Sequence, residues 1–229
     1  MFYAIITEEN EPTILGGTVM IDGREKKGNK TKEVLLNATI ALIAENGLEA
    51  LSANSIAKKA NVSKASVFHH FGSMETIQQE AFIFADVLMS EALEQIYQEA
   101  KETDSFADIM LKYFLFFIEE KNKDYLNLIN VQMQFVLKSS YDTEFEEIIF
   151  GKDSEKTPFD FFEILVGDFY GDTLDANDLE LVNDLIIILI NGFTTFLISK
   201  ADKEWLVSLW KENIKMIEIY IHSLIESNS

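Results

Sequence analysis

The stretch from Thr31 to Ile77 constrains the fold of this chain more than any other part of its sequence. Apolar residues in its first half recur at the i, i+3, i+4 and i+7 spacing of one helix face, and Gly47 follows, where a helix C-terminus favours a positive φ. Two short helical segments come next, and Asn61, which tolerates the left-handed conformation, stands between them. The pattern predicts one long helix, then two short helices joined by a tight turn.

The expected helices in this stretch span 32–46, 53–60 and 64–70, and a fourth begins at residue 74. Thr31, Ser52 and Ser63 are the expected N-caps of the first three, because a serine or threonine oxygen can accept from the first backbone N–H groups. Val67 and Phe71 lie four residues apart and are expected on the buried side of the third helix. Two short helices at such a turn form a helix-turn-helix, whose second helix enters the major groove of DNA.

The stretch resembles the DNA-binding head of the TetR family of bacterial transcriptional repressors, without a gap from Lys32 to Ile77. The residues that carry the resemblance are Gly47, Ile56, Ala57, Val62, Ser63, His70, Phe71, Ser73 and Glu75. The resemblance implies an all-α fold in which a three-helix head precedes a larger helical domain for ligand binding and dimerisation. The expected divisions are an N-terminal extension and basic arm at 1–30, the head at 31–77 and the ligand-binding and dimerisation domain at 78–229.

The expected DNA contacts centre on the third helix of the head. Lys64 can reach a guanine edge or a phosphate, Ala65 can contact a thymine methyl group, and Ser66 offers a hydroxyl. The full set of candidate DNA-binding residues is Lys30, Lys32, Lys58, Lys59, Ser63, Lys64, Ala65, Ser66, His69 and His70. A packing or capping role competes for His70, and a solvated helix surface competes for the two lysines of the preceding helix.

Two positions depart from the family pattern. Phe68 stands where the family usually has tyrosine, and Met74 stands where a lysine usually follows the capping serine. Each replacement removes a group that could contact phosphate, while the apolar packing and the cap are kept. The expected consequence is weaker DNA binding with a salt dependence reduced by up to about two counterions.

The formal net charge of −20 argues against a nucleic-acid partner until its distribution is considered. Residues 24–72 carry eight lysine and arginine side chains against four glutamates, whereas residues 73–229 carry 11 basic and 31 acidic side chains. Affinity for a phosphate backbone depends on local positive charge, so the head remains the expected DNA-binding part. The acidic body should discourage DNA binding in the wrong orientation.

The rest of the chain is rich in apolar residues that recur at helical spacing. The helices expected there span 74–100, 105–120, 124–139, 143–150, 159–170, 176–200 (capped by Asp175) and 203–226. Their excess of aromatic residues, together with two methionines, is what an apolar ligand cavity would be lined with, although ordinary core packing is the competing interpretation. The candidate ligand-binding residues are Met110, Phe114, Phe117, Met133, Phe135 and Phe162.

The last two expected helices are more apolar than one small body can easily bury. A two-fold partner using the same pair would form a four-helix interface, which is also how TetR-family proteins dimerise. The candidate dimer-interface residues are Leu189, Gly192, Phe193, Phe196, Leu209 and Ile217. The apolar run 185–199 is expected to be too short to span a bilayer, so no membrane partner is predicted.

Residues 1–19 allow two interpretations. Their two β-prone apolar runs flank a polar break and could form a hairpin, or Met20 is the natural start and they are an upstream extension. They lack the basic first part of a secretory signal.

The sequence contains no cysteine, P-loop or metal-ligand spacing, so neither catalysis nor a cofactor or metal is predicted, and a reducing cytoplasm fits. The function predicted from the residues and the resemblance is a homodimeric repressor that binds a palindromic double-stranded operator. A small apolar or amphipathic effector would release it. The alternative is a TetR-like ligand-binding dimer that acts through protein partners, with weak or lost DNA binding.

Overall fold

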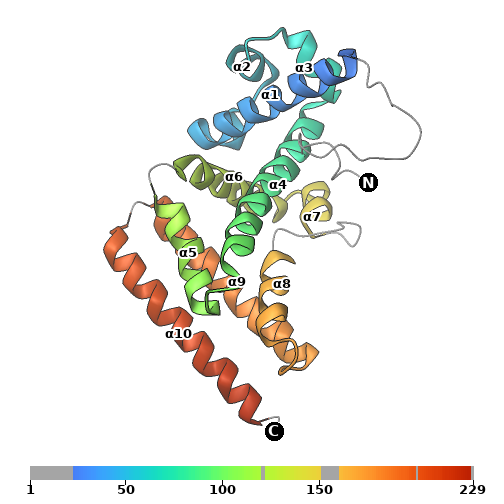
Figure 1. Ribbon diagram of the computed structural model, residues 1–229. Helices are drawn as coiled ribbons and strands as arrows, with labels where there is room; N and C mark the ends of the chain where they lie inside the picture. The colour runs from blue at the N-terminus through green and yellow to red at the C-terminus, as the bar shows by residue number, and fades with distance from the viewer. Residues whose placement is uncertain (1–22, 120–121, 151–159, 200, 228–229) are drawn as a thin grey trace, which may run out of the picture.

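The computed structural model describes residues 23–119, 122–150, 160–199 and 201–227. All regular elements in these ranges are helices, which confirms the predicted all-α fold class. Figure 1 shows a small head above a larger helical body, with α4 (Met74–Ala100) running from one into the other. The hairpin considered for residues 1–19 lies outside the described residues.

The head is built from four helical elements before α4. They are α1 (Gly23–Asn46), the 3-10 helix η1 (Leu48–Ala50), α2 (Ala53–Lys59) and α3 (Lys64–Phe71). The chain reverses at Gly47, with φ of 82°, and at Asn61, with φ of 54°, which are the two positions where the sequence indicates a left-handed backbone. The short helix η1 is not among the predicted elements.

The start of α1 differs from the prediction. The helix begins at Gly23 rather than at residue 32, so residues 24–30, which were expected to belong to the basic arm before a helix capped by Thr31, form its first turns. Residues 24–27 are Arg, Glu, Lys and Lys, all favourable helix formers. Extending a helix needs no new nucleus, so the cost of about 1 kcal/mol at Gly28 does not end it.

The body contains α4 and six further helices. They are α5 (Phe106–Ile118), α6 (Lys123–Ser139), α7 (Thr143–Phe150), α8 (Asp160–Tyr170), α9 (Ala176–Ile198) and α10 (Lys203–Ser227). The expected bounds agree with these within two residues, and those of α4 and α7 agree at both ends. Capping explains the agreement, because the Ser73 hydroxyl accepts from the Thr76 amide at 3.1 Å and the Asp175 carboxylate accepts from the Asp178 amide at 2.9 Å.

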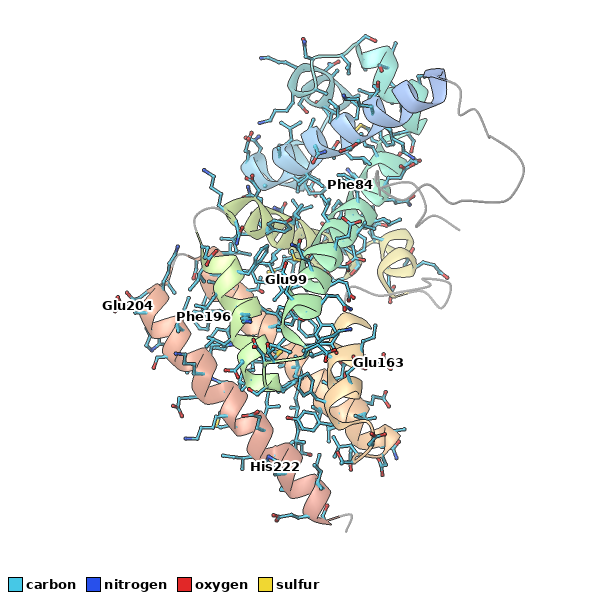
Figure 2. The ribbon with its side chains drawn as sticks, viewed as in Figure 1. Phe84, Glu99, Glu163, Phe196, Glu204 and His222 are labelled. Atoms are coloured by element: carbon cyan, nitrogen blue, oxygen red, sulfur yellow. The ribbon has the colours of Figure 1, made fainter. Side chains whose placement is uncertain are left out.

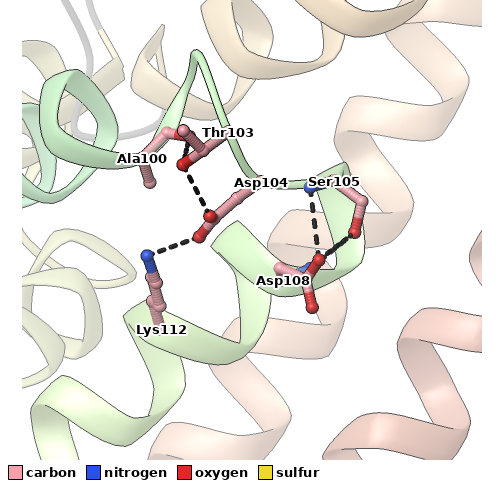
Figure 3. A network of polar contacts seen from close by, with 6 residues as sticks. All are labelled: Ala100, Thr103, Asp104, Ser105, Asp108 and Lys112. Atoms are coloured by element: carbon pink, nitrogen blue, oxygen red, sulfur yellow. Dashed lines mark hydrogen bonds and ion pairs between the residues drawn. The ribbon is translucent and has the colours of Figure 1, made fainter.

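The turn between α4 and α5 is held by polar side chains, as Figure 3 shows. Ser105 caps α5 by accepting from the Asp108 amide at 3.2 Å, and Asp108 accepts in return from the Ser105 amide at 3.3 Å. Asp104 forms an ion pair with Lys112 in the second turn of α5, and this contact lowers the pKa of the Asp104 carboxyl. Helix α4, which runs from the head into the body and is called the lever helix below, is therefore fixed to the body at its C-terminal end.

The centre of the body is a contact between α5, α9 and α10. The Phe114 ring stacks on Trp210 with centroids 4.7 Å apart, and Phe193 meets Trp210 edge to face at 5.0 Å. The indole N–H of Trp210 donates to the Met110 carbonyl at 3.0 Å, so its polar atom is satisfied while the ring is buried. Buried aromatic area of this kind stabilises the fold by about 2–3 kcal/mol per ring.

Candidate nucleic-acid interface

The turn between α2 and α3 fixes the direction of the candidate recognition helix. The Ser52 hydroxyl caps α2 by accepting from the Ser55 amide at 3.1 Å, and the Ser63 hydroxyl caps α3 by accepting from the Ser66 amide at 3.1 Å. Between the helices, the left-handed Asn61 allows the Val62 amide to donate back to the Ala57 carbonyl at 3.0 Å. The predicted caps at Ser52 and Ser63 and the predicted turn are confirmed.

The two sides of α3 have different environments. Val67 and Phe71 are buried, with exposed fractions of 1% and 5%, and anchor the helix in the head. The exposed side chains are those of Lys64, Ala65, Phe68 and His69. We call these four residues the α3 outer face. They include three of the predicted DNA-contact residues together with Phe68, while Ser66 and His70 are half-buried and Ser63 is exposed at the cap.

The candidate lysines are not equivalent. Lys59 pairs with Glu45 at 2.5 Å, and Lys32 pairs with Glu80 of α4 at 2.5 Å while lying over the Phe71 ring. Within the described part of the chain, Lys58 and Lys64 form no ion pair with a carboxylate. Both are exposed, as is Lys30 in α1. Lys30, Lys58 and Lys64 are consequently the described head lysines most available to phosphate or base, whereas Lys32 and Lys59 are also engaged in ion pairs.

His70 is a poor cation in this setting. Its ring lies 5.4 Å from the His69 ring, and partial burial, followed by the charges of His69 and Lys32, lowers the pKa of His70 below its ordinary value of 6.5. The imidazole is thus neutral near pH 7. A neutral, half-buried histidine at the end of α3 suits packing better than phosphate contact.

The body reaches into the head through Gln134 of α6. Its side-chain oxygen accepts from the Leu48 amide of η1 at 2.8 Å, and its side-chain nitrogen donates to the Ile43 carbonyl at the end of α1 at 3.3 Å. The same oxygen lies 3.7 Å from where a Cβ on Gly47 would stand. One amide therefore satisfies two backbone groups at the turn between α1 and η1, and we call this contact the Gln134 bridge.

Helix α6 also contacts the lever. Lys138 donates to the Gln78 side chain of α4 at 2.8 Å, and Gln132 donates to the Asp86 carboxylate of α4 at 3.3 Å. The Lys138 amine lies 3.7 Å from the centre of the Phe145 ring of α7. A movement of α6 would therefore change its contacts both with α4 and with the turn after α1.

The candidate ligand residues are dispersed through the packed body. Phe114 stacks on Trp210, Phe135 stacks on Phe145 at 5.5 Å, and Phe162 meets Tyr113 edge to face at 6.1 Å. Met110 is fully buried, whereas Phe117 and Met133 are half-buried. These contacts place Phe114, Phe135 and Phe162 in the core of the described body.

Two hollows open at the surface of the described body. The first, of about 180 Å³, lies between the ends of α5 and α9 and the starts of α6 and α10, and Phe117 lines it with Leu126 and Lys203. The second, of about 220 Å³, lies between α5 and α10 beside Trp210. Of the six candidate ligand residues, Phe117 lines the first hollow and none lines the second.

Helix α9 exposes an apolar stripe. Leu181, Leu185, Ile188 and Phe196 have exposed fractions of 43%, 37%, 68% and 45%, and they lie on one helix face with Gly192. Figure 2 labels Phe196 on this helix. Exposed apolar residues continue on α10 at Trp205, Met216 and Ile219. We call these residues the α9–α10 stripe.

The candidate dimer residues divide between this stripe and the protomer core. Gly192 and Phe196 are exposed, and the space where a Cβ of Gly192 would stand is open. Phe193 and Ile217 are buried within the protomer, at 5% and 9% exposed, and Leu189 and Leu209 are half-buried. Ile188, the most exposed of these apolar residues, is not among the candidates, although the spacing of Leu181, Leu185 and Ile188 is visible in the sequence.

The length argument against a membrane span needs correction. The apolar run 185–199 lies in α9, whose 23 residues are long and apolar enough to cross a bilayer by length and composition, with 22% of the apolar window buried. A single helix of this kind is weak evidence for a membrane span, because core and interface helices share the same composition.

Among the described residues, no group of His, Asp and Glu side chains could hold a metal ion.

Comparison with known sequences identifies the head. Residues 35–81 match the family model described as bacterial regulatory proteins, tetR family. The HTH-type transcriptional regulator UidR of Escherichia coli (strain K12) is 30% identical over 95 residues, which is 41% of this chain. That match covers 45% of the length of UidR, so the chain matches about half of this curated relative.

Comparison with solved structures extends to the body. A putative TetR-family transcriptional regulator from Mesorhizobium loti has a TM-score of 0.66 at 14% identity, covering 83% of this chain and 96% of that one. A transcriptional regulator from Rhodococcus sp. Rha1 has a TM-score of 0.63 at 20% identity, covering 81% and 95%. The multidrug binding protein EbrR, complexed with imidazole, has a TM-score of 0.53 at 11% identity, covering 80% and 93%.

The sequence match falls on the helix-turn-helix head, and the structural matches cover most of the described chain at identities that establish the fold. UidR is a transcriptional regulator with the same type of head. The head of this chain therefore matches the model of the tetR family of bacterial regulatory proteins, and the described chain shares the fold of solved TetR-family regulators.

Proposed function

We propose that this protein is a dimeric repressor that binds a palindromic DNA operator through α3 and leaves it when a small molecule binds the body. The observation that carries the DNA-binding part is the α3 outer face. A buried side of α3 and the Ser63 cap hold Lys64 and Ala65 in solvent at the start of the helix, where a recognition helix meets base edges.

Dimerisation is supported by the α9–α10 stripe. Its side chains are apolar, exposed and aligned on neighbouring helices, which suits a self-complementary surface related by a two-fold axis. Such a dimer would present two copies of α3 to successive major grooves about 34 Å apart. The expected operator is therefore a palindrome.

Ligand response is supported by the position of α6. This helix packs among the body helices, bonds the lever at Gln78 and Asp86, and bonds the head through the Gln134 bridge. A ligand that binds better to a shifted body would change the spacing of the two heads and reduce operator affinity. The structural neighbour EbrR is described as a multidrug binding protein, which favours an apolar or amphipathic effector here.

The second candidate function is a ligand-binding dimer that acts through protein partners. It is favoured by Phe68 and Met74, which replace groups that could contact phosphate, and by the pairing of Lys32 and Lys59 with glutamates. The two candidates differ in one property, because only the repressor requires sequence-selective DNA binding.

Gel-shift titration of the full-length protein with DNA from its own promoter, across a salt series, tests the DNA-binding part. Lys64→Ala should weaken selective binding by on the order of 10–100-fold if Lys64 contacts a base edge. If Lys64 contacts phosphate, affinity should fall for all sequences and the salt slope by about one. Lys123→Ala, which removes an exposed lysine at the start of α6, is the matched control and should change neither.

Intact selective binding by Lys64→Ala would refute the role of α3. No selective binding by the wild-type dimer at low salt would favour the protein-partner function.

A thermal-shift screen of apolar and cationic compounds tests the ligand part. A true effector should raise the melting temperature of the protein and release it from DNA in the gel shift. Compounds that stabilise the protein without changing DNA affinity would contradict ligand release.

A further inference from the structure

Phe68 is an exposed aromatic residue on the α3 outer face. Its exposed fraction is 40%, whereas that of Val67 beside it is 1%. It lies one helical turn after Lys64 and three residues after Ala65, so the three side chains are neighbours on one surface. The core of the head does not require Phe68, because Val67 and Phe71 fill the buried side of α3.

The chemistry of the ring restricts what it can contact on DNA. A phenyl group has no hydrogen-bond donor or acceptor, so it can neither bind a phosphate oxygen as a tyrosine would nor read the polar edges of the bases. Among the groups that base pairs present in the major groove, the apolar one is the C5 methyl of thymine. An aromatic ring held in that groove therefore has one complementary partner.

The neighbours of Phe68 support this partner. The Lys64 amine lies 5.8 Å from the centre of the Phe68 ring, a contact that keeps the cation beside the ring at the start of α3. The lysine can then reach a guanine edge or a phosphate while the ring remains on the apolar group. Ala65 adds a second small apolar surface without blocking the approach.

We propose that Phe68, together with Ala65, is a specificity-determining surface that selects thymine in the operator through its C5 methyl group. The inference rests on the proposed DNA binding and adds to it the base that is read. The position where the family usually has a phosphate-binding hydroxyl then carries an apolar base contact, which is independent of salt. Burial of one methyl group corresponds to about a fourfold change in affinity per half-site, and on the order of tenfold when both half-sites change.

The experiment replaces thymine with deoxyuridine, which lacks only the methyl group. Duplexes are first selected from a random pool by the full-length protein at low salt. Each thymine of the enriched sequence is then exchanged in turn, symmetrically in both half-sites, and the Kd is measured. For the wild-type protein, at least one position should weaken on the order of tenfold, and the others should change little.

Variants of Phe68 assign the effect to its side chain. Phe68→Ala should bind the thymine duplex about as weakly as the wild type binds the deoxyuridine duplex, with little further loss on exchange. Phe68→Leu keeps an apolar side chain and should retain most of the discrimination. Because Phe68 is exposed, both variants should melt near the wild-type temperature.

The outcomes separate this inference from the proposed function. Enriched duplexes that tolerate deoxyuridine at every position would overturn the role of Phe68 and leave DNA binding intact. Unchanged thymine sensitivity in Phe68→Ala would also overturn it. A pool with no enriched sequence would remove both the DNA-binding function and this inference.

Discussion

The head and the body of this protein use their side chains in opposite ways. In the head, the candidate functional side chains Lys64 and Ala65 are exposed, and short-range caps and turns fix where they point. In the body, the candidate ligand residues Phe114 and Phe135 are buried in aromatic stacks that hold the helices together. Exposure therefore marks the candidate site in the head, whereas in the body the candidate residues pack into the core.

The α9–α10 stripe is the exception within the body, and disrupting it should have the largest effect. Ile188→Asp places an unpaired carboxylate in each half of the expected dimer interface, at a cost of about 3–5 kcal/mol per buried charge. The dimer should dissociate at micromolar concentration, and operator affinity should fall more than about 100-fold. Sedimentation or light scattering, followed by gel shift, measures both.

The matched control is Ile83→Asp on α4. Ile83 is an isoleucine of similar exposure, 53% against 68% for Ile188, and lies outside the stripe. The Ile83→Asp variant should therefore remain dimeric. A dimer that survives Ile188→Asp unchanged would show that exposure in the body does not mark its interface.

Phe114→Ala tests whether the aromatic residues of the body are core or ligand contacts. Removing a ring that stacks on Trp210 and meets Phe193 edge to face should destabilise the protein by about 3–5 kcal/mol and lower its melting temperature by about 10 °C. Phe68→Ala, an exposed aromatic in the head, should shift it by little. A small effect of Phe114→Ala would instead indicate a cavity wall that tolerates empty space.

Gln134→Ala probes the contact that joins the two regions. It leaves the Leu48 amide and the Ile43 carbonyl without their side-chain partner, at a cost of about 1–3 kcal/mol. Hydrogen exchange of the Leu48 amide should become faster, and the change in DNA affinity caused by an effector should shrink. The control is Gln132→Ala, which removes the hydrogen bond from α6 to Asp86 of α4. This variant should leave the Leu48 amide protected.

If the two variants leave the Leu48 amide equally protected, the Gln134 bridge does not hold the head. The contact would then not couple the body to the head.

The smallest expected effect is a pH dependence from His70. Because burial and neighbouring charge lower its pKa in the folded head, the unfolded chain binds a proton more readily near pH 6.5. Stability therefore falls as the pH drops through that value, by on the order of 1 °C in melting temperature or less. His70→Asn should flatten this part of the profile, and equal slopes for the two proteins would contradict a lowered pKa.

Much of the fold was predictable because its signals are local. Helical periodicity and the caps at Ser52, Ser63, Ser73 and Asp175 placed most helix ends within two residues. The predicted start of α1 was wrong because Thr31 does not cap a helix here. The helix continues through Thr31, since extending a helix that has already formed is favourable. The short helix η1 was missed because its Leu48 amide donates to the side chain of Gln134, which lies far along the chain.

The features of the candidate site also divide into those that local sequence predicts and those that depend on how the helices pack. The exposure of Lys64 and the burial of Val67 follow from helix spacing, and both were predicted. The pairing of Lys32 with Glu80 depends on how α1 crosses α4, which no local pattern encodes. The body residues were harder still, since an aromatic residue for a ligand and one for the core have the same spacing.

Hydroxyl-radical footprinting of a selected or promoter duplex by the wild-type protein tests the central claim most directly. A dimer that reads DNA through α3 should protect two half-sites on one face of the duplex, with centres about 34 Å apart, or about ten base pairs. The protection should weaken steeply with salt and disappear for Lys64→Ala at concentrations where Lys123→Ala still protects. Uniform protection, or none at low salt from an intact dimer, would contradict a DNA-reading head.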